Sequence, residues 1–329
     1  MKSVGLKAKL ARKFVYTVFP DVRKYTSIKP AFGNSPDSPE GRLVPEVVAL
    51  HGKPGIHILK MVLVLPYLLG TAYYARKSVT SVRRNPERGK KIAPPEFFEE
   101  LELYAKSLGV LEVGYTKLTP DLVFSNRAVL FENAIVLIGE MRKGEIAKAP
   151  GVRAGIEVWR TYYRLTKAAY KIAEFLRKGG YNAQPDPAVG GSTNFPLLAQ
   201  KAGLGHIGKY GLLITPENGP SVRIGVVYTD LELPYTDERV WEYEWIPDFC
   251  DRCNACVRAC PAQAIYTTPK RENGREVHVD YKKCAVVFSR TLGCSVCVKE
   301  CTFTKGDYGK IKRAYERVVE KEKASKTPS

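Results

Sequence analysis

Residues 250–261 read CDRCNACVRACP, a run of four cysteines at intervals of two, two and three residues that ends on a proline. A second run has the spacing Cys284-x9-Cys294-x2-Cys297-x3-Cys301. Two-residue gaps let one tight loop present three thiolates to a cubane cluster, and the fourth cysteine, beside the proline, reaches a second cluster. The spacing therefore predicts two [4Fe–4S] clusters held by all eight cysteines. The expected ligand sets are Cys250, Cys253, Cys256 and Cys301 for one cluster, and Cys260, Cys284, Cys294 and Cys297 for the other.

Zinc sites and disulfides are the other common uses of eight cysteines. Structural zinc sites use paired CxxC knuckles rather than this run. Four disulfides would need an oxidising compartment, and no apolar stretch typical of a secretory signal follows the first residues, MKSVGLK. We therefore favour clusters and expect a cytoplasmic protein. The second run departs from the usual pattern, because Cys284 stands far from the triplet and Thr302 replaces the usual proline.

Positive charge is concentrated in the first part of the chain. The net charge is +18 over 329 residues, and residues 1–92 hold 18 Lys and Arg against 5 Asp and Glu. Such a basic segment favours an anionic partner, which could be a phospholipid surface, a nucleic acid or an acidic protein. A solvated basic face without a partner is the alternative.

Residues 61–75 (MVLVLPYLLGTAYYA) carry no charge, but Pro66 and Gly70 interrupt them and they are shorter than the ~20 residues of a spanning helix. We interpret this segment first as a buried helix and second as a membrane-surface element.

The remaining sequence predicts a mixed fold, α/β or α+β. Short apolar runs at 110–115, 134–138 and 222–229 are typical of buried strands. A long helix is expected over 156–178, where Val158, Tyr162, Leu165, Ala169, Ile172 and Leu176 form an apolar stripe. We predict a basic extension over 1–92, a reductase-like core over 93–235, a ferredoxin-type domain over 236–304 and a charged helical tail over 305–329. A ferredoxin alone needs far fewer residues, so the long preceding segment favours a catalytic core.

Glycines are frequent just before the cysteines, in AGLGHIGKYGLLITPENGP (202–220). Gly203, Gly205 and Gly208 would let the backbone approach a large flat ligand without a side-chain clash. The run is not a dinucleotide-binding fingerprint, because no clear strand leads into it.

This run, followed by VRIGVVYTDLEL (222–233) and the double cysteine motif, resembles the cobalamin-dependent reductive dehalogenases and their relative epoxyqueuosine reductase. Segments 114–124, 134–150 and 162–185 are similar to dehalogenase segments in order and spacing. The resemblance covers roughly residues 93–304. It implies a nitroreductase-like core that binds a corrinoid, with a C-terminal bacterial-ferredoxin-like domain whose two clusters deliver electrons to cobalt.

The resemblance also implies site residues. The proton donor of the dehalogenases, a tyrosine at the start of the long helix, falls on Tyr162, with its neighbour Tyr163 as the second choice. A phenol, with an ordinary pKa of about 10, is a weak acid that can give one proton to a developing carbanion. Without the resemblance, Tyr162 would be interpreted as a core aromatic of the helix stripe. Lys209 is expected to act on Tyr162 or to contact the corrinoid. The expected corrinoid-binding residues are Gly203, Gly205, His206, Ile207, Gly208, Leu213 and Thr215.

The leading hypothesis is a corrinoid- and iron–sulfur-dependent reductase that receives electrons from a soluble donor, such as a ferredoxin or flavodoxin, and reduces a small organic substrate. It could rest on an anionic membrane surface through its N-terminal segment. A second hypothesis is an electron-transfer or corrinoid-reactivating protein without a substrate of its own. A third is a tRNA-modifying reductase similar to epoxyqueuosine reductase. The third is disfavoured, because residues 191–196 (GSTNFP) lack the aspartate that the family uses in a D-[ST]-x-P stretch.

Overall fold

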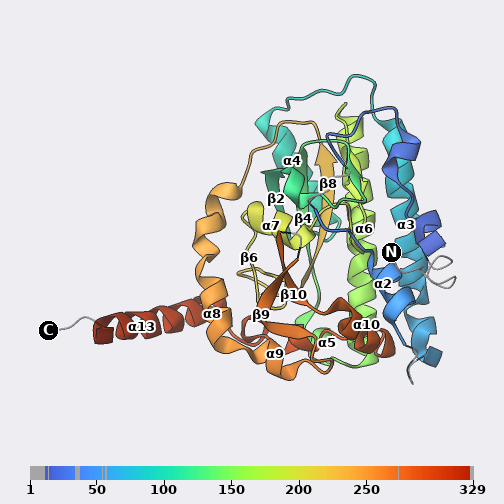
Figure 1. The fold of residues 1–329 in the computed structure, drawn as a ribbon. Helices are drawn as coiled ribbons and strands as arrows, with labels where there is room; N and C mark the ends of the chain where they lie inside the picture. Colours follow the sequence, from blue (N-terminus) through green and yellow to red (C-terminus); the bar gives the residue numbers. More distant parts are fainter. Residues whose placement is uncertain are drawn as a thin grey trace.

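A four-stranded sheet forms the centre of the computed structural model, which describes residues 12, 13, 15–33, 38–53, 55, 58–272 and 274–326 (Figure 1). The strand order is β2 (Glu112–Lys117), β4 (Asn133–Glu140), β8 (Val222–Thr229) and β5 (Gln184–Asp186). All neighbouring strands in this sheet are antiparallel. Of the two fold classes expected, α+β is therefore the accurate description. Residues 1–11 of the expected basic extension lie outside the described residues.

The central strand β4 explains why the sheet is covered on both sides. Successive side chains of a strand point to opposite faces. Ile135 and Leu137 share a core with helix α6 (Val152–Lys178), whereas Val136 and Ile138 share a core with helix α7 (Phe195–Lys201). Figure 1 shows α6 on one side of the sheet and α7 on the other. The strands predicted over 110–115, 134–138 and 222–229 are confirmed as β2, β4 and β8.

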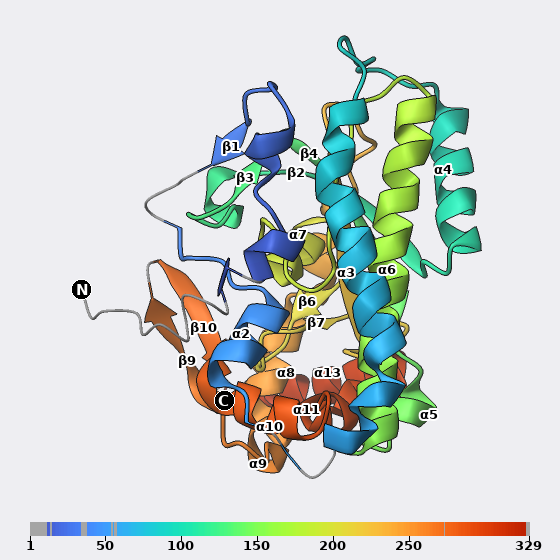
Figure 2. The ribbon, with the colours of Figure 1, turned by 90° about the vertical axis from the view of Figure 1, so that its right-hand side faces the viewer.

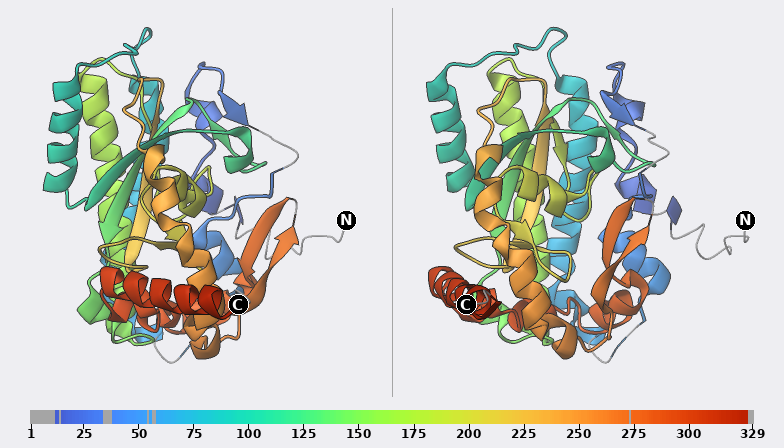
Figure 3. Two further views of the ribbon diagram at one scale, coloured as in Figure 1. Left: turned by 90° about the vertical axis from the view of Figure 1, so that its left-hand side faces the viewer. Right: turned by 60° about the vertical axis from the view of Figure 1, so that its left-hand side comes forward.

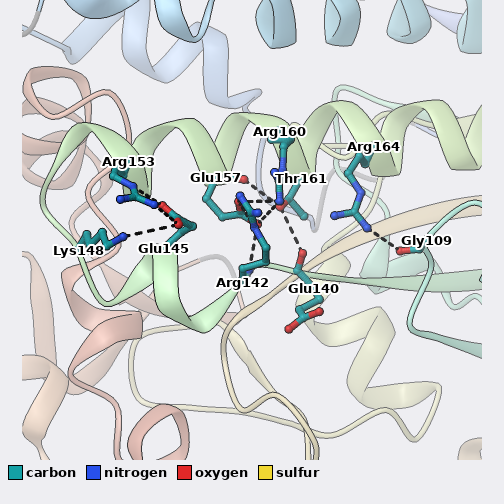
Figure 4. A network of polar contacts seen from close by, with 10 residues as sticks. All are labelled: Gly109, Glu140, Arg142, Glu145, Lys148, Arg153, Glu157, Arg160, Thr161 and Arg164. Atoms are coloured by element: carbon teal, nitrogen blue, oxygen red, sulfur yellow. Dashed lines mark hydrogen bonds and ion pairs between the residues drawn. The ribbon is translucent and has the colours of Figure 1, made fainter.

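The long helix α6 confirms the helix predicted over 156–178 and begins earlier, at Val152. Its apolar stripe is buried against the sheet, and Gly180, with φ +87°, turns the chain away at its end. The carboxylate of Glu157 is fully buried and bonds the Arg142 side chain at 2.9 Å and the Arg160 side chain at 3.0 Å (Figure 4). These contacts join the first turns of α6 to the segment between β4 and α5 (Lys143–Ile146).

Helices from two other parts of the chain pack outside α6. Figure 2 shows α3 (Leu65–Thr80) and α4 (Pro95–Ser107) running beside it. Val64 and Ala75 are buried in the same core as α6, so the second half of the predicted extension is part of the main body. Among the described residues, no helix combines the length and apolar character that crossing a membrane requires. The other elements of the N-terminal segment are η1 (Val22–Tyr25), β1 (Phe32–Gly33), α2 (Val44–His51), η2 (Ile58–Leu63) and η3 (Ser81–Arg84).

The C-terminal part carries the cysteines on short helices and turns at one end of the sheet (Figure 3). Its helices are η5 (Asp237–Tyr243), α8 (Trp245–Cys253), α9 (Ala255–Ala259), α10 (Tyr281–Arg290), α11 (Val296–Lys299), α12 (Thr302–Lys305) and α13 (Tyr308–Lys326). A hairpin of β9 (Ile265–Glu272) and β10 (Arg275–Val279) lies between α9 and α10. The remaining elements of the core are η4 (Pro120–Leu122), β3 (Ala128–Val129), β6 (His206–Ile207) and β7 (Leu213–Ile214).

Candidate functional site

The eight cysteines lie in two groups of four, and all are free thiols. One group lines a small cavity and the other lines part of a much larger one. The first group consists of Cys250, Cys253, Cys256 and Cys301. The second consists of Cys260, Cys284, Cys294 and Cys297. These groups have the same members as the two expected ligand sets.

The two groups share a local backbone geometry. Asn254 follows Cys253 with φ +48°, and Ser295 follows Cys294 with φ +58°. Left-handed backbone is uncommon for residues other than glycine, and here it occurs directly after the first cysteine of two CxxC turns, Cys253–Cys256 and Cys294–Cys297. The Thr302 hydroxyl, which stands where proline is usual, lies 3.2 Å from Cys253 Sγ. Both turns therefore bend the chain sharply between cysteines of one group.

The chemistry of these thiols fits iron–sulfur clusters. Burial raises the pKa of Cys250 to about 12 and that of Cys284 to about 11, so in both residues burial favours the neutral thiol over the thiolate. A cationic iron centre supplies the positive charge that stabilises buried thiolates. Among the described residues, no three His, Cys, Asp or Glu side chains are placed to hold a single metal ion.

A cavity of about 480 Å³ joins the second group of cysteines to the α+β core. This volume lies within the range typical of ligand pockets. The core contributes a mostly apolar wall, which includes Phe195, Leu213 and Ile224. The polar side chains in this wall include Tyr162, Thr193, Asn194 and Arg223. Tyr210 lines this cavity and also the small cavity of the first group. The Tyr210 side chain thus borders both sets of thiols.

Tyr162 and Arg223 are two polar side chains of the cavity wall that contact each other. Helix α6 carries Tyr162, and its first turns are held by the buried Glu157 network (Figure 4). Strand β8 carries Arg223, whose guanidinium carbon lies 5.2 Å from the centre of the Tyr162 ring. Arg223 Nη1 donates to the Val222 carbonyl at 3.1 Å, while the buried Nε has no hydrogen-bond partner among the described residues. The pair offers one exchangeable proton and one positive charge to a ligand in the cavity.

The neighbouring tyrosine lies on a different side of α6. The Tyr163 ring packs against α3, with ring centres 6.3 Å from Tyr67 and 6.1 Å from Tyr74. A side chain at Gly70 would collide with it, since a Cβ there would lie 2.6 Å from the Tyr163 ring. Tyr163 therefore contributes to helix packing, and Tyr162 is the one of the two that lines the cavity.

Lys209 lies beside the first group of cysteines. Its side chain is buried, and Nζ lies 2.7 Å from Asp251 Oδ1. Its backbone N–H interacts with the Cys250 sulfur and partly opposes the effect of burial on the pKa of that thiol. The expectation that Lys209 acts on Tyr162 therefore differs from the structure, in which the cation over the Tyr162 ring is Arg223.

The glycines of the 202–220 run face the protein's own backbone. A Cβ at Gly203, where φ is +67°, would lie 2.3 Å from the Thr236 carbonyl oxygen. A Cβ at Gly205, where φ is +140°, would lie 2.1 Å from the Ile214 carbonyl oxygen. The missing side chains at Gly203 and Gly205 thus make room for the chain's own backbone, and corrinoid contact at these glycines stays a prediction.

Most of the other expected corrinoid-binding residues also contact nearby residues of the chain. A Cβ at Gly208 would lie 2.6 Å from the Ile214 side chain. His206 Nδ1 lies 3.0 Å from the Ile207 carbonyl, and the Ile207 N–H donates to Gln200 Oε1 at 3.0 Å. Thr215 donates its hydroxyl to the Gly219 carbonyl at 3.2 Å. Of the expected set, all of it described by the structure, Leu213 lines the large cavity.

Sequence reasoning missed several residues of the cavity. Arg223 had a detectable signal, because it is the one charged residue in the otherwise uncharged strand VRIGVVYT. Thr193 and Asn194 lie in the GSTNFP stretch, whose notable sequence feature is a missing aspartate. No local pattern marks Phe124 or Tyr210, because they reach the cavity only through tertiary packing.

Comparisons with known proteins agree with this geometry. A 4Fe-4S dicluster domain matches residues 249–305. The chain is 37% identical over 216 residues to a tetrachloroethene reductive dehalogenase of Desulfitobacterium hafniense, in an alignment that covers 60% of this chain and 37% of that protein. It is 23% identical over 253 residues to an epoxyqueuosine reductase of Listeria monocytogenes, covering 63% of this chain and 65% of that protein. The chain thus spans little more than a third of the length of the dehalogenase relatives.

A solved structure shares the fold. The match is to a reductive dehalogenase whose structure suggests a mechanism for B12-dependent dehalogenation, with a TM-score of 0.60 and 21% sequence identity over 77% of this chain and 39% of that one. The relatives of this chain in sequence are therefore reductive dehalogenases and epoxyqueuosine reductases, and its fold is reductive dehalogenase-like with a C-terminal 4Fe-4S ferredoxin-type domain.

Proposed function

We propose that the chain is a corrinoid- and iron–sulfur-dependent reductase that replaces a leaving group on a small organic molecule with hydrogen. The observation that carries this proposal is the shared cavity, in which Tyr162 and Arg223 lie with four cysteines of the ferredoxin part. The 37% identity to a tetrachloroethene reductive dehalogenase supports an uncharged organohalide as the substrate class.

The donor sets suit the proposed cofactors. The first group of cysteines would hold one cluster and the second group the other, with the second next to the cavity. When bound, clusters of this type transfer single electrons, and a corrinoid provides a cobalt centre that delivers electrons to carbon. The mostly apolar residues at 193–196, 212–213 and 222–224 would surround the corrinoid and exclude water from it.

Tyr162 and Arg223 would perform the acid–base part of the reaction. The balanced reaction is R–X + 2e⁻ + H⁺ → R–H + X⁻, which consumes one proton per turnover. Tyr162 Oη would give this proton to the carbon that loses X. The Arg223 guanidinium, over the face of the Tyr162 ring, would stabilise the negative charge left on the phenol oxygen or on X⁻. The enclosing apolar wall strengthens both interactions by lowering the local dielectric constant.

The test is anaerobic purification with cobalamin supplied, followed by metal analysis, a UV–visible spectrum and an activity assay. We expect about eight iron atoms and about one cobalt atom per chain. We also expect halide release from tetrachloroethene or 2,6-dibromophenol with reduced methyl viologen as the electron donor. Eight iron atoms without cobalt, even after reconstitution, would reject the proposal and favour the alternative of an electron-transfer protein. Cobalt binding without halide release would reject dehalogenation.

We propose that the electron donor is an acidic one-electron carrier, such as a ferredoxin or flavodoxin. The formal net charge of +18 supports this, because opposite charge accelerates association and makes it sensitive to salt. The rate of cluster reduction by such a donor should fall as the salt concentration rises. Reduction by methyl viologen, which is a cation, should not fall in the same way.

We propose that η2 and α3 contact an anionic membrane surface. Leu59, Val62 and Leu69 are 86%, 64% and 61% exposed, an unusual density of exposed apolar side chains on one short segment. Lys60, Arg76 and Lys77 flank it and are also exposed. Apolar residues bordered by cations are typical of helices that lie in a membrane interface. The test is co-sedimentation with vesicles. Sedimentation of the protein with phosphatidylglycerol vesicles but not with phosphatidylcholine vesicles, lost in Leu69→Ser, would support this contact. An equal amount of sedimented protein with and without phosphatidylglycerol vesicles would reject it.

A further inference from the structure

Three buried side chains form a line of hydrogen bonds that leads away from the large cavity. Thr193 Oγ1 lies 2.9 Å from the Tyr228 hydroxyl oxygen, and the Tyr228 hydroxyl donates to Asp186 Oδ2 at 2.8 Å. The three residues are 2%, 0% and 5% exposed. They come from the turn before α7, from β8 and from β5, so the line crosses the edge of the sheet. Each link is short enough to carry a proton.

The two ends of this line reach two different cavities. Thr193 lines the large cavity, as does Tyr162. Asp186 lines a second pocket of about 40 Å³, whose wall includes Asp21 and Arg127. The carboxylate and the guanidinium make the wall of this outer pocket polar, and the pocket is large enough to hold water.

Asp186 is suited to change its protonation state near neutral pH. Burial raises the pKa of Asp186 to about 6, although the Ser192 N–H, the Tyr228 hydroxyl and the charge of Arg127 favour the carboxylate. The Ser192 N–H donates to Oδ2 at 2.6 Å. Asp21, whose pKa is lowered mainly by the Arg23 side chain against the effect of burial, is the other carboxylate among the described residues that line the outer pocket.

We propose that Asp186, Tyr228 and Thr193 relay protons from the outer pocket to the large cavity, where they replace the proton that Tyr162 gives to the substrate. This inference rests on the proposed function, because a reduction of that kind consumes a proton in every cycle. When Asp186 is protonated, its O–H becomes the donor to Tyr228 Oη, and the Tyr228 hydroxyl turns to Thr193 Oγ1. In one concerted step Asp186 gives its proton to Tyr228, Tyr228 gives its own to Thr193, and Thr193 gives its own to the phenolate of Tyr162, directly or through a water molecule in the cavity, so that no hydroxyl holds two protons. The Asp186 carboxylate left behind takes a proton from water in the outer pocket, and no electron moves.

A purely structural network would hold the turn at 187–194 without moving protons. The two roles differ in their response to conservative substitutions. Thr193→Val removes the hydroxyl at nearly constant shape, whereas Thr193→Ser keeps the hydroxyl and removes a methyl group. A relay loses its function in the first variant and recovers it in the second, whereas a packing role is disturbed by both.

The test measures halide release from tetrachloroethene and 2,6-dibromophenol by the reconstituted protein, in H₂O and D₂O, between pH 5.5 and 8.5. The variants are Thr193→Val, Thr193→Ser, Tyr228→Phe and Asp186→Asn. Tyr115→Phe is the matched control, because Tyr115 is equally buried in β2 and its hydroxyl bonds Glu102 at 3.0 Å, outside the line. Independently of turnover, the infrared carboxylic acid band of the protein without corrinoid should titrate near pH 6, vanish in Asp186→Asn and shift in Tyr228→Phe.

We expect Thr193→Val, Tyr228→Phe and Asp186→Asn to lower kcat about tenfold or more with little change in KM, and to increase the solvent isotope effect. Thr193→Ser should restore most of the turnover lost in Thr193→Val, and Tyr115→Phe should behave as the unmodified protein. If Tyr228→Phe is no slower than Tyr115→Phe in a protein that releases halide, the relay is wrong and the proposed function stands. If the unmodified protein releases halide from neither probe, the proposed function fails and the relay fails with it.

Discussion

The guanidinium of Arg223 lies over the aromatic face of Tyr162, with 5.2 Å between its central carbon and the ring centre. A cation over a tyrosine ring is attracted by the π electrons, and the attraction grows in a site that excludes water. The two residues come from β8 and α6, which pack against each other across one face of the sheet. Their contact defines the part of the cavity where proton transfer is expected.

Tyr162→Phe should abolish turnover and leave cofactor binding intact. The substitution removes the proton donor and keeps the ring that packs beside Trp159. We expect halide release to fall by at least about a hundredfold, with unchanged iron and cobalt contents. Tyr163→Phe is the matched control, because it changes the adjacent residue of the same helix, which packs on α3 instead. An equal loss of halide release in Tyr162→Phe and Tyr163→Phe would show that the effect is structural.

Arg223→Met should lower turnover by about a hundredfold, because the positive charge beside the Tyr162 ring is lost. Arg223→Lys should recover part of the activity, since an ammonium keeps the charge but not the planar stacking group. Arg239→Met, which removes a cation paired with Glu112 at 3.5 Å outside the cavity, provides the comparison. Activity in Arg223→Met equal to that in Arg239→Met would remove Arg223 from the mechanism.

Pairs of cysteine substitutions can test the proposed ligand sets by iron analysis. Cys253→Ala combined with Cys301→Ala affects one proposed cluster, so about four iron atoms should remain. Cys253→Ala combined with Cys284→Ala affects both clusters, so little iron should remain. The electron paramagnetic resonance spectrum of the reduced protein should lose one signal in the first case and both in the second. The reverse ranking of iron content would contradict the proposed grouping.

Glu157→Ala should destabilise the fold and displace Tyr162. The substitution leaves the Arg142 and Arg160 side chains without their shared carboxylate (Figure 4). We expect the free energy of unfolding, measured in urea, to fall by about 2 kcal/mol. Glu145→Ala should cost less, because its partner Arg153 is largely exposed. A ranking in the opposite order would mean that the buried carboxylate is not a stabilising contact.

Asp186 should give the protein a measurable pH dependence of stability. Burial raises its pKa from the ordinary 3.8 to about 6, so the folded protein holds this proton more tightly than the unfolded chain does. The stability contributed by the carboxyl is present below about pH 4 and is lost as the pH rises through about 6, a change on the order of 3 kcal/mol. The free energy of unfolding relative to Asp186→Asn should therefore fall over this range and then level off. If the free energies of unfolding of the unmodified protein and of Asp186→Asn change in parallel with pH, the prediction is wrong.

Local patterns in the sequence were sufficient to predict the ferredoxin part and the main helices and strands of the core. Spacing within CDRCNACVRACP constrains three thiols to one loop by covalent geometry alone. The apolar stripe of α6 and the uninterrupted apolar run of β4 follow from the periods of a helix and a strand. The same reasoning did not predict the neighbours of the glycine run, because a missing side chain is equally compatible with a bound ligand and with a neighbouring backbone. At Gly203 and Gly205 the neighbour is the backbone.

The sequence by itself therefore determined the iron–sulfur class of cofactor and predicted the two cysteine groups, whereas Tyr162 as the proton donor came from the family resemblance and stays a prediction. Only the tertiary structure decided which cation accompanies Tyr162, because the sequence marks Lys209 and Arg223 alike as cations and does not show that β8 places Arg223 over the ring while Lys209 pairs with Asp251. It also brought Thr193, Tyr228 and Asp186 into one line, although they come from separate segments without a shared motif. Contacts of this kind depend on how helices and strands pack across a sheet, and no spacing along the chain encodes them.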